Sequence, residues 1–346
     1  MPHFYAFFCL VFSLLSISAS AQKAAPDASE KLLCRRLNYL MALKKQVAKD
    51  HWAAYGKRTV ENEIRFYTEQ GVYLVNPQKQ TLAETRTESC HCPGFKLFRV
   101  NDSLNTSYQM FTNFADGIAA CNDVTVSRRY IPDVKDTETW AMMVVHEQFH
   151  QYQTNHKPFQ KRAIAMLSGG QYLSHDSIRA IYNANPAFKK AVNQENDLLL
   201  VCLQTDRKTA IDSMLTQLLR IRNERLASYK KATGFDLSVK EEFEQIAEAG
   251  TRYIEYHLSN DFKKYPVDPR LAAVDTSYHA NRGFANYSLE HEGQYLYKMG
   301  ATYYYALGFN SIRLVEKLGI PFKDRMYAEP DYSFTKVFEA YLKKRF

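Results

Sequence analysis

Residues 140–150 restrict the fold of this chain more than any other segment. Six apolar residues are followed directly by the sequence His146-Glu-Gln-Phe-His150. Asp136 stands a few residues earlier, where the start of a helix favours an acidic side chain. An apolar run of this length leaves no polar stripe that could face solvent. The segment therefore predicts a helix that is buried on nearly all sides.

Two histidines and a glutamate suggest a metal site on this helix. At 3.6 residues per turn, His146 and His150 project from the same face, so both imidazoles can reach one ion. Glu147 points beside that face, where it can take the proton of a metal-bound water. The pattern is typical of zinc hydrolases, and zinc is the expected ion. The alternative is a core helix with two hydrogen-bonded histidines, although a buried polar trio is costly without partners.

A catalytic zinc ion needs a third protein ligand and an open fourth position. A third histidine at the short spacing of the metzincins is absent, because His156 lies six residues after His150. We therefore expect a carboxylate from another helix. Glu248, on a predicted helix over 238–259, is the best candidate, and Glu292 is its rival.

Glu248 belongs to a row of glutamates that helical spacing places on one face: Glu241, Glu244, Glu248 and Glu255. Such a row is usually a solvated face, which is the alternative interpretation. The residues around Glu248 are small or apolar, however, and Gly250 follows two positions later. These neighbours favour a buried and closely packed helix.

The two segments together resemble the gluzincins, the zinc peptidases of the thermolysin and aminopeptidase N kind. Their second helix carries Asn-Glu-Gly-Phe-Ala-x-Tyr-x-Glu, and this chain has Ala-Glu-Ala-Gly-Thr-Arg-Tyr-Ile-Glu at 247–255. The resemblance implies that Glu248 is the third zinc ligand and that Glu255 orients a ligand histidine. Asn-Glu-Gly is replaced by Ala-Glu-Ala, and Glu248 lies 98 residues after His150. An insertion over roughly 160–237 is therefore expected to be helical and to fold away.

A further match lies at 297–301, where Tyr-Lys-Met-Gly-Ala resembles the Tyr-Glu-Lys-Gly segment of the aminopeptidase N family. The match implies that Tyr297 donates a hydrogen bond to the oxyanion formed during peptide hydrolysis. His291 and the tyrosines at 295, 303, 304 and 305 are the other candidates. The Gly-x-Met-Glu-Asn segment by which that family reads a free substrate amine is missing from 60–135, so exopeptidase specificity is not implied.

The resemblance implies an α+β, mostly helical, zincin-like fold over 57–346. A small β-rich lobe (57–157) would carry the motif helix at the cleft, followed by a helical insertion (158–237) and a helical lobe (238–346). Residues 117–126 are expected to supply an edge strand that pairs with an extended substrate.

The implied activity is zinc-dependent hydrolysis of peptide bonds in a peptide or protein substrate, by a zinc-bound water that Glu147 activates. One alternative is a non-catalytic zinc-binding pseudopeptidase or binding module on the same scaffold. The other is a structural helical protein with a chance match to the motif.

Hydrophobic spacing predicts further elements. Helices are expected over 30–54, over 188–230 as one broken helix or a hairpin, over 238–259 with Ser238 and Glu241 in a capping box, and over 292–317. Strands are expected on both sides of Gly71, over 96–100 and over 117–126, whereas 77–94 has the composition of turns. Pro158 is expected to close the motif helix.

The first residues indicate export. An uncharged apolar run over 4–17 is followed by the small residues Ala-Ser-Ala at 19–21, which is typical of a cleavable signal peptide. We therefore expect a signal peptide over 1–21, a leader and helix over 22–56, and a secreted or periplasmic protein. The run is short for a membrane span, and no later segment approaches one.

The net charge of +8 is spread along the chain, without the basic stripe that a nucleic-acid partner would favour. Five cysteines follow the predicted cleavage site: Cys34, Cys90, Cys92, Cys121 and Cys202. Export permits disulfides, and we expect one from the loop at 90–92, with Cys121 as the suggested partner. A zinc site in this loop would lack further ligands nearby in sequence.

Overall fold

The computed structural model describes residues 28–76, 86–92, 94–100, 107–168, 174–287 and 303–344. The predicted signal peptide over 1–21 lies outside the described residues. So do His291, Glu292 and Tyr297. Within the described ranges the chain has an α+β fold that is mostly helical, as expected.

Six strands of the described residues form one mixed sheet in the order β3-β4-β2-β1-β6-β5. Their bounds are Ile64–Thr68 (β1), Gly71–Val75 (β2), Arg86–Cys92 (β3), Phe95–Val100 (β4), Met110–Thr112 (β5) and Ala119–Asn122 (β6). β1 and β6 are parallel, and the other neighbours are antiparallel. The predicted hairpin at Gly71 is confirmed: this glycine starts β2 with a φ of 142°, which suits a residue without a Cβ.

Two expectations for the sheet are wrong. β6 lies between β1 and β5, so β5 rather than the 117–126 segment is the edge strand. Asp123 then caps α2 (Val124–Tyr130) by accepting a hydrogen bond from the Val126 amide, which ends β6 early. β3 occupies part of the segment expected to form turns, because pairing with β4 offsets its polar composition.

The motif helix is α3 (Thr137–Thr154), and it is buried as predicted. Every residue of α3 except Met143 is buried. Asp136 and Thr139 form a capping box at its start, which satisfies amides that a buried helix end would otherwise leave unpaired. α3 packs against α1 (Ala28–His51) and against β5 and β6. Pro158 lies in the first turn of the next helix, α4 (Lys157–Ser168), where its missing amide hydrogen is harmless.

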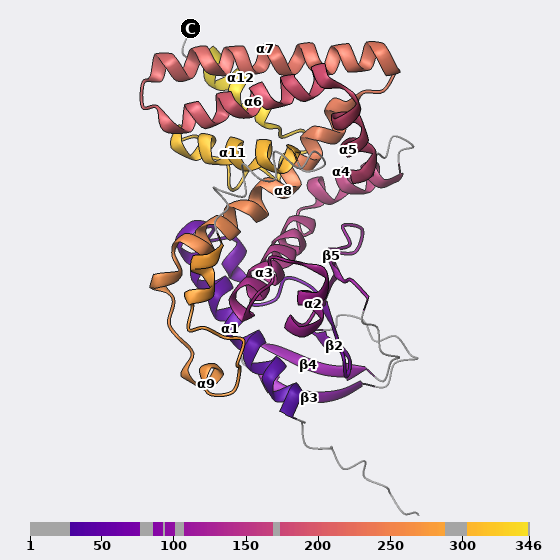
Figure 1. The fold of residues 1–346 in the computed structure, drawn as a ribbon, viewed down its shortest axis with the longest axis vertical. Coiled ribbons are helices and arrows are strands. Elements are labelled where there is room, and N and C mark those ends of the chain that lie inside the picture. The colour runs from indigo at the N-terminus through magenta and orange to yellow at the C-terminus, as the bar shows by residue number, and fades with distance from the viewer. Residues whose placement is uncertain are drawn as a thin grey trace, which may run out of the picture.

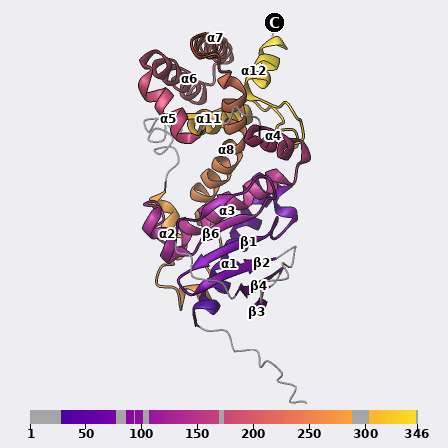
Figure 2. The same cartoon turned by 90° about the vertical axis from the view of Figure 1, so that its right-hand side faces the viewer.

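The rest of the described chain is mostly helical, and most of it lies at the opposite end of the molecule from the sheet, whereas the connection over 261–287 returns to the sheet end beside α1 (Figures 1 and 2). Its main helices are α5 (His175–Ala184), α6 (Pro186–Gln204), α7 (Lys208–Thr233), α8 (Leu237–Asn260), α11 (Tyr303–Lys317) and α12 (Phe334–Lys343), with a short α9 (Pro269–Ala272) in the connection. α6 and α7 form the predicted hairpin, which stacks on α11. α8 runs from these helices down to α3, so it links the two ends of the molecule (Figure 1).

The start of α8 differs from the expected capping box. The helix begins at Leu237, and Asp236 is the N-cap, accepting a hydrogen bond from the Ser238 amide. Glu241 points instead to Arg225 of α7, with Nη1–Oε1 and Nη2–Oε2 distances of 2.7 and 2.8 Å. Arg225 also bonds Glu195 of α6 at 2.6 Å. This buried ion cluster joins three helices and occupies Glu241 away from the motif histidines.

Glycines let α8 approach its neighbours. A Cβ on Gly250 would lie 2.5 Å from Phe149 Cε1 of α3 and would also collide with the Tyr327 hydroxyl. A Cβ on Gly308 of α11 would lie 2.5 Å from the Gln245 carbonyl oxygen of α8. Distances below 3 Å are closer than carbon atoms tolerate, so both helix contacts require glycine.

Cys34 is disulfide-bonded, whereas Cys121 and Cys202 are free buried thiols. The suggested pairing of the 90–92 loop with Cys121 is therefore wrong. Cys121 lies on β6, inside the sheet and fully buried in the core. None of the helices in the described ranges is long and apolar enough to cross a membrane.

Candidate metal centre

His146 and His150 of α3 face Glu248 of α8. Each imidazole Nε2 lies 3.6 Å from a different oxygen of the Glu248 carboxylate. The three ligand atoms lie within 4.8 Å of one another, and all three residues are buried. The helical spacing of the histidines and the close contact at Gly250 bring these groups together.

A hydrogen-bond chain fixes the tautomer of His150. Gln153 Nε2 donates to the Ala247 carbonyl oxygen at 2.7 Å and to the Tyr327 hydroxyl at 3.0 Å. The Gln153 Oε1 atom therefore faces His150 Nδ1, at 2.9 Å. Because an amide oxygen only accepts, Nδ1 carries the proton and the Nε2 lone pair points at Glu248. Gln153 lies one helical turn beyond His150, but no sequence pattern indicates its role.

Glu255 fixes His146 in the same way, as the sequence predicted. His146 Nδ1 lies 2.6 Å from Glu255 Oε1, so its Nε2 is also left to face Glu248. The other carboxylate oxygen of Glu255 accepts a bond from Arg252 Nη1 at 2.8 Å and from the Tyr287 hydroxyl at 3.4 Å. Arg252 and Tyr287 were not predicted, because the motif spacing carries no signal for them.

Burial and charge act differently on the two histidines. Burial alone lowers the pKa of His146, but the negative charges of Glu255, Glu147 and Glu248 outweigh it, so the pKa is raised. Burial, followed by the charge of His146, lowers the pKa of His150 to about 4. Burial raises the pKa of Glu255, but Arg252 and His146 outweigh it and hold the pKa below its usual range. His150 is therefore a neutral imidazole at neutral pH, the form that binds a metal.

The arrangement fits a divalent cation. The Nε2 atoms of two imidazoles and the carboxylate oxygens of Glu248 face one another. Glu248 Oε2 is buried and has no hydrogen-bond partner in the described part of the chain. Two histidines and a carboxylate are the ligands of many catalytic zinc sites, whose ligand atoms lie about 3.3 Å apart. The two histidine–carboxylate distances of 3.6 Å are close to that value, and all three ligand atoms lie within 4.8 Å of one another.

Glu147 is held beside this cluster by the edge strand. The Thr112 hydroxyl of β5 lies 2.8 Å from Glu147 Oε2 and 2.9 Å from the Glu147 carbonyl oxygen. Glu147 is buried, with 6% of its surface exposed. Its carboxylate is thus positioned next to the two histidines, at the point where the sheet meets α3. Thr112 lies in a strand of three residues, too short to be predicted from hydrophobic spacing.

No family model matches this chain. No curated protein and no solved structure matches it either. The resemblance to the gluzincins therefore depends on the motif residues of α3 and α8 and on the 297–301 segment, which lies outside the described residues.

The other acidic residues of α8 are used elsewhere. Glu241 bonds Arg225 and the Tyr303 hydroxyl, and Glu244 pairs with Lys240. Of the row of four glutamates, Glu248 and Glu255 reach the motif histidines. The spacing of the four glutamates does not show which of them reach the histidines. Glu241, for example, is paired with Arg225, which comes from another helix.

One of the competing tyrosines lies near the cluster. Burial, followed by the charge of Glu248, raises the pKa of Tyr305 well above its usual value. The guanidinium of Arg252 lies 5.2 Å from the Tyr305 ring centroid. Among the described tyrosines of the predicted group, Tyr305 of α11 is affected by the charge of Glu248, whereas Tyr303 donates a hydrogen bond to Glu241.

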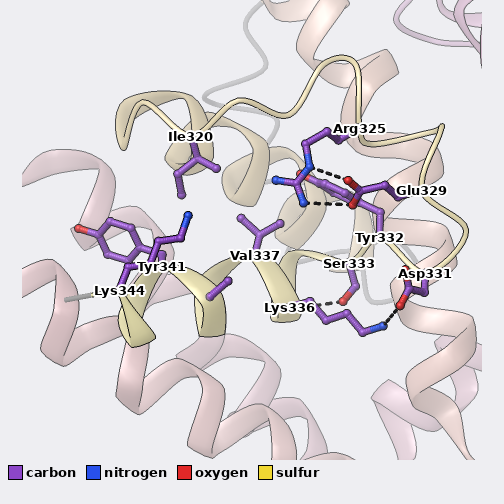
Figure 3. Close-up of a pocket in the computed structure, with 11 residues that line it drawn as sticks. Ile320, Arg325, Glu329, Asp331, Tyr332, Ser333, Lys336, Val337, Tyr341 and Lys344 are labelled. Carbon is purple, nitrogen blue, oxygen red and sulfur yellow. Dashed lines mark hydrogen bonds and ion pairs between the residues drawn. The ribbon is translucent and has the colours of Figure 1, made fainter. Parts of the chain in front are cut away.

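A cavity at α12 is a separate feature (Figure 3). It is lined by residues of the last segment, and none of the predicted site residues contributes to it. Arg325 bonds Glu329 and Lys336 bonds Asp331, both at 2.6 Å. These charges neutralise each other, so the cavity does not compete with the histidine cluster as a candidate site.

Proposed function

We propose that this protein is an exported zinc metallopeptidase of the gluzincin type. One observation carries the proposal: His146, His150 and Glu248 present three metal-ligand atoms within 4.8 Å of one another. The charge of Glu147 acts on both histidines, which places this residue near the cluster. Glu255 and Gln153 support it, because each holds one histidine with its Nε2 atom toward Glu248.

The protein groups would divide the chemistry as follows. His146, His150 and Glu248 would hold a zinc ion, which would lower the pKa of a coordinated water and polarise a substrate carbonyl. Glu147 accepts the proton of the attacking water and passes it to the leaving amine. Thr112 keeps the Glu147 carboxylate in place. Tyr297 remains the proposed donor to the oxyanion, and Tyr305 is the described alternative.

A peptide substrate is favoured by the position of β5. This strand ends the sheet and pairs only with β6 among the described strands. An extended peptide can add to such an edge through backbone hydrogen bonds. Because Thr112 of β5 bonds Glu147, a peptide bound there would pass directly beside the proposed base.

Two further features support the assignment. The sheet end and the helical end meet at α3 and α8, which is the arrangement expected of a zincin-like fold. The disulfide at Cys34 favours an oxidising compartment, in agreement with the predicted signal peptide.

A comparison of the wild type with Glu147→Gln tests the proposal. We expect both proteins to bind stoichiometric zinc, measured by atomic emission, and only the wild type to cleave an unbiased peptide mixture. Zinc binding without cleavage by either protein would indicate a binding module on the same scaffold. Absence of stoichiometric zinc from both would refute the metal site.

A further inference from the structure

A second cluster of potential metal ligands lies where α1 and α8 end. His51 is the last residue of α1, His257 lies in the last turn of α8, and Asp261 is the C-cap of α8. His51 Nε2 is 2.7 Å from Asp261 Oδ2. One ligand atom from each residue lies within 4.8 Å of the others.

His257 supplies the unsatisfied side-chain atom of this cluster. Its Nε2 atom is buried and has no hydrogen-bond partner among the described residues. Its ring stacks on His51, with centroids 3.5 Å apart and planes inclined by 15°. A buried imidazole nitrogen without a partner loses hydrogen bonds that water would supply. An ion at the cluster would satisfy it.

We propose that His51, His257 and Asp261 form a second site, for a divalent transition-metal ion such as zinc. Two imidazole nitrogens and one carboxylate oxygen are ligands that such ions prefer. All three residues are partly exposed, so an ion can enter from solvent and water can complete its coordination. The site is distinct from the proposed catalytic centre.

Two rearrangements would accompany ion binding, one at Lys264 and one at the stacked histidine rings. Lys264 Nζ bonds Asp261 Oδ1 at 2.6 Å, which leaves Oδ2 to face the histidines. Lys264 is exposed and can move aside. The two rings are nearly parallel, and nitrogen lone pairs lie in the ring planes, so one ring must turn for both to bind the same ion. We therefore expect the stack between His51 and His257 to be lost when the ion binds.

The role of this site would be structural. It connects the end of α1 to the end of α8, and α8 carries Glu248 and Glu255. His257 lies nine residues after Glu248, which corresponds to about 14 Å along the helix axis. An ion at this distance cannot share ligands with the first site, but it would fix the helix that supplies the third ligand.

The test uses the full chain with His146→Ala and His150→Ala, which removes the proposed catalytic site. We expect this variant to bind one Zn²⁺ in calorimetric titration, and its Tm to rise by several degrees with excess metal. Bound Co²⁺ should give the visible absorption bands of an ordered nitrogen and oxygen site.

Adding His51→Gln, or separately His257→Gln, to this variant should abolish binding. His156→Gln is the matched control, because His156 belongs to neither cluster, and it should leave binding unchanged. Circular dichroism verifies that each variant is folded. As a second measurement, His51→Gln in the otherwise wild-type chain should bind one ion fewer than the wild type. Absence of binding to the double alanine variant, or binding that survives both glutamine substitutions, would overturn the proposal.

Discussion

Gly250 of α8 lies against Phe149 of α3, with room for no more than a hydrogen atom between them: a Cβ on Gly250 would be 2.5 Å from Phe149 Cε1. Phe149 directly precedes His150, and Gly250 follows Glu248 by two residues. The distance between the two helices at this contact therefore sets the distance between the proposed metal ligands.

Replacement of Gly250 by alanine should push α8 away from α3. We expect a destabilisation of about 1–3 kcal/mol, as for other overpacked cores, and a loss of zinc affinity that exceeds what the change in stability explains. Urea denaturation and competition with a chromogenic chelator measure the two effects. Val239→Ala, at an exposed position of α8, is the control. Unchanged zinc affinity in Gly250→Ala would show that the helix contact does not position Glu248.

Gln153→Leu should weaken zinc binding by about 10–100-fold, the usual effect of removing a partner that orients a ligand histidine. Leucine keeps much of the volume but leaves His150 Nδ1 without its acceptor. Gln153→Glu restores an acceptor and should recover much of the affinity. Chelator competition on the purified variants gives the comparison. Equal affinities for the leucine and glutamate variants would contradict an orienting role.

Thr112→Val should lower kcat about tenfold and leave zinc content unchanged, because the hydroxyl holds Glu147 but contacts no proposed ligand. This magnitude corresponds to the loss of one hydrogen bond to a charged group. Thr112→Ser keeps the hydroxyl and should restore activity. The measurement is steady-state kinetics on any peptide that the wild type cleaves, and loss of zinc from the valine variant would argue for a structural role instead.

Asp275 should make stability depend on pH in the acid range. Burial raises the pKa of Asp275, but its bonds to Arg36, both 2.7 Å long, outweigh burial and hold the pKa below its usual value. The folded protein therefore binds this proton less tightly than the unfolded chain does. The stabilisation is complete above the unfolded pKa of about 3.9 and is lost as the pH falls through the lower folded pKa.

Asp275→Asn should accordingly cost about 3–5 kcal/mol at pH 7, because Arg36 would remain buried without its partner. The variant should also lose part of the pH dependence below about pH 4. Urea denaturation at a series of pH values tests both statements. Asp176→Asn, which alters an exposed ion pair, should leave the curves unchanged; a similar loss in both variants would refute the assignment to Asp275.

The sequence allowed prediction of those parts of the site that depend on local spacing. His146 and His150 share a face because a helix has a fixed period, and small neighbours around Glu248 indicated a close helix contact. Gln153 was equally local, but a glutamine becomes informative only when Ala247 and Tyr327 fix its amide. Thr112 depends on the order of β6 and β5 in the sheet, which pairing between distant segments decides.

The errors have the same origin. The segment after Gly117 was expected to be an edge strand from the resemblance to the gluzincins, but β5 covers its outer side. Ser238 and Glu241 have the spacing of a capping box, but Arg225 from α7 attracts Glu241 and Asp236 caps the helix. Cys121 was a reasonable disulfide partner by count alone, yet β6 places it inside the core. In each case a contact distant in sequence outweighed a local preference.

The long separation of Glu248 from His150 has a consequence for biosynthesis. A nascent chain that has emerged only as far as α7 contains both motif histidines and the proposed base, but not the carboxylate that completes the ligand set. Two imidazoles on a helix that still lacks α8 as a packing partner would hold zinc weakly. We therefore expect the metal centre to assemble late, after α8 has docked, so that metal uptake reports completion of the fold.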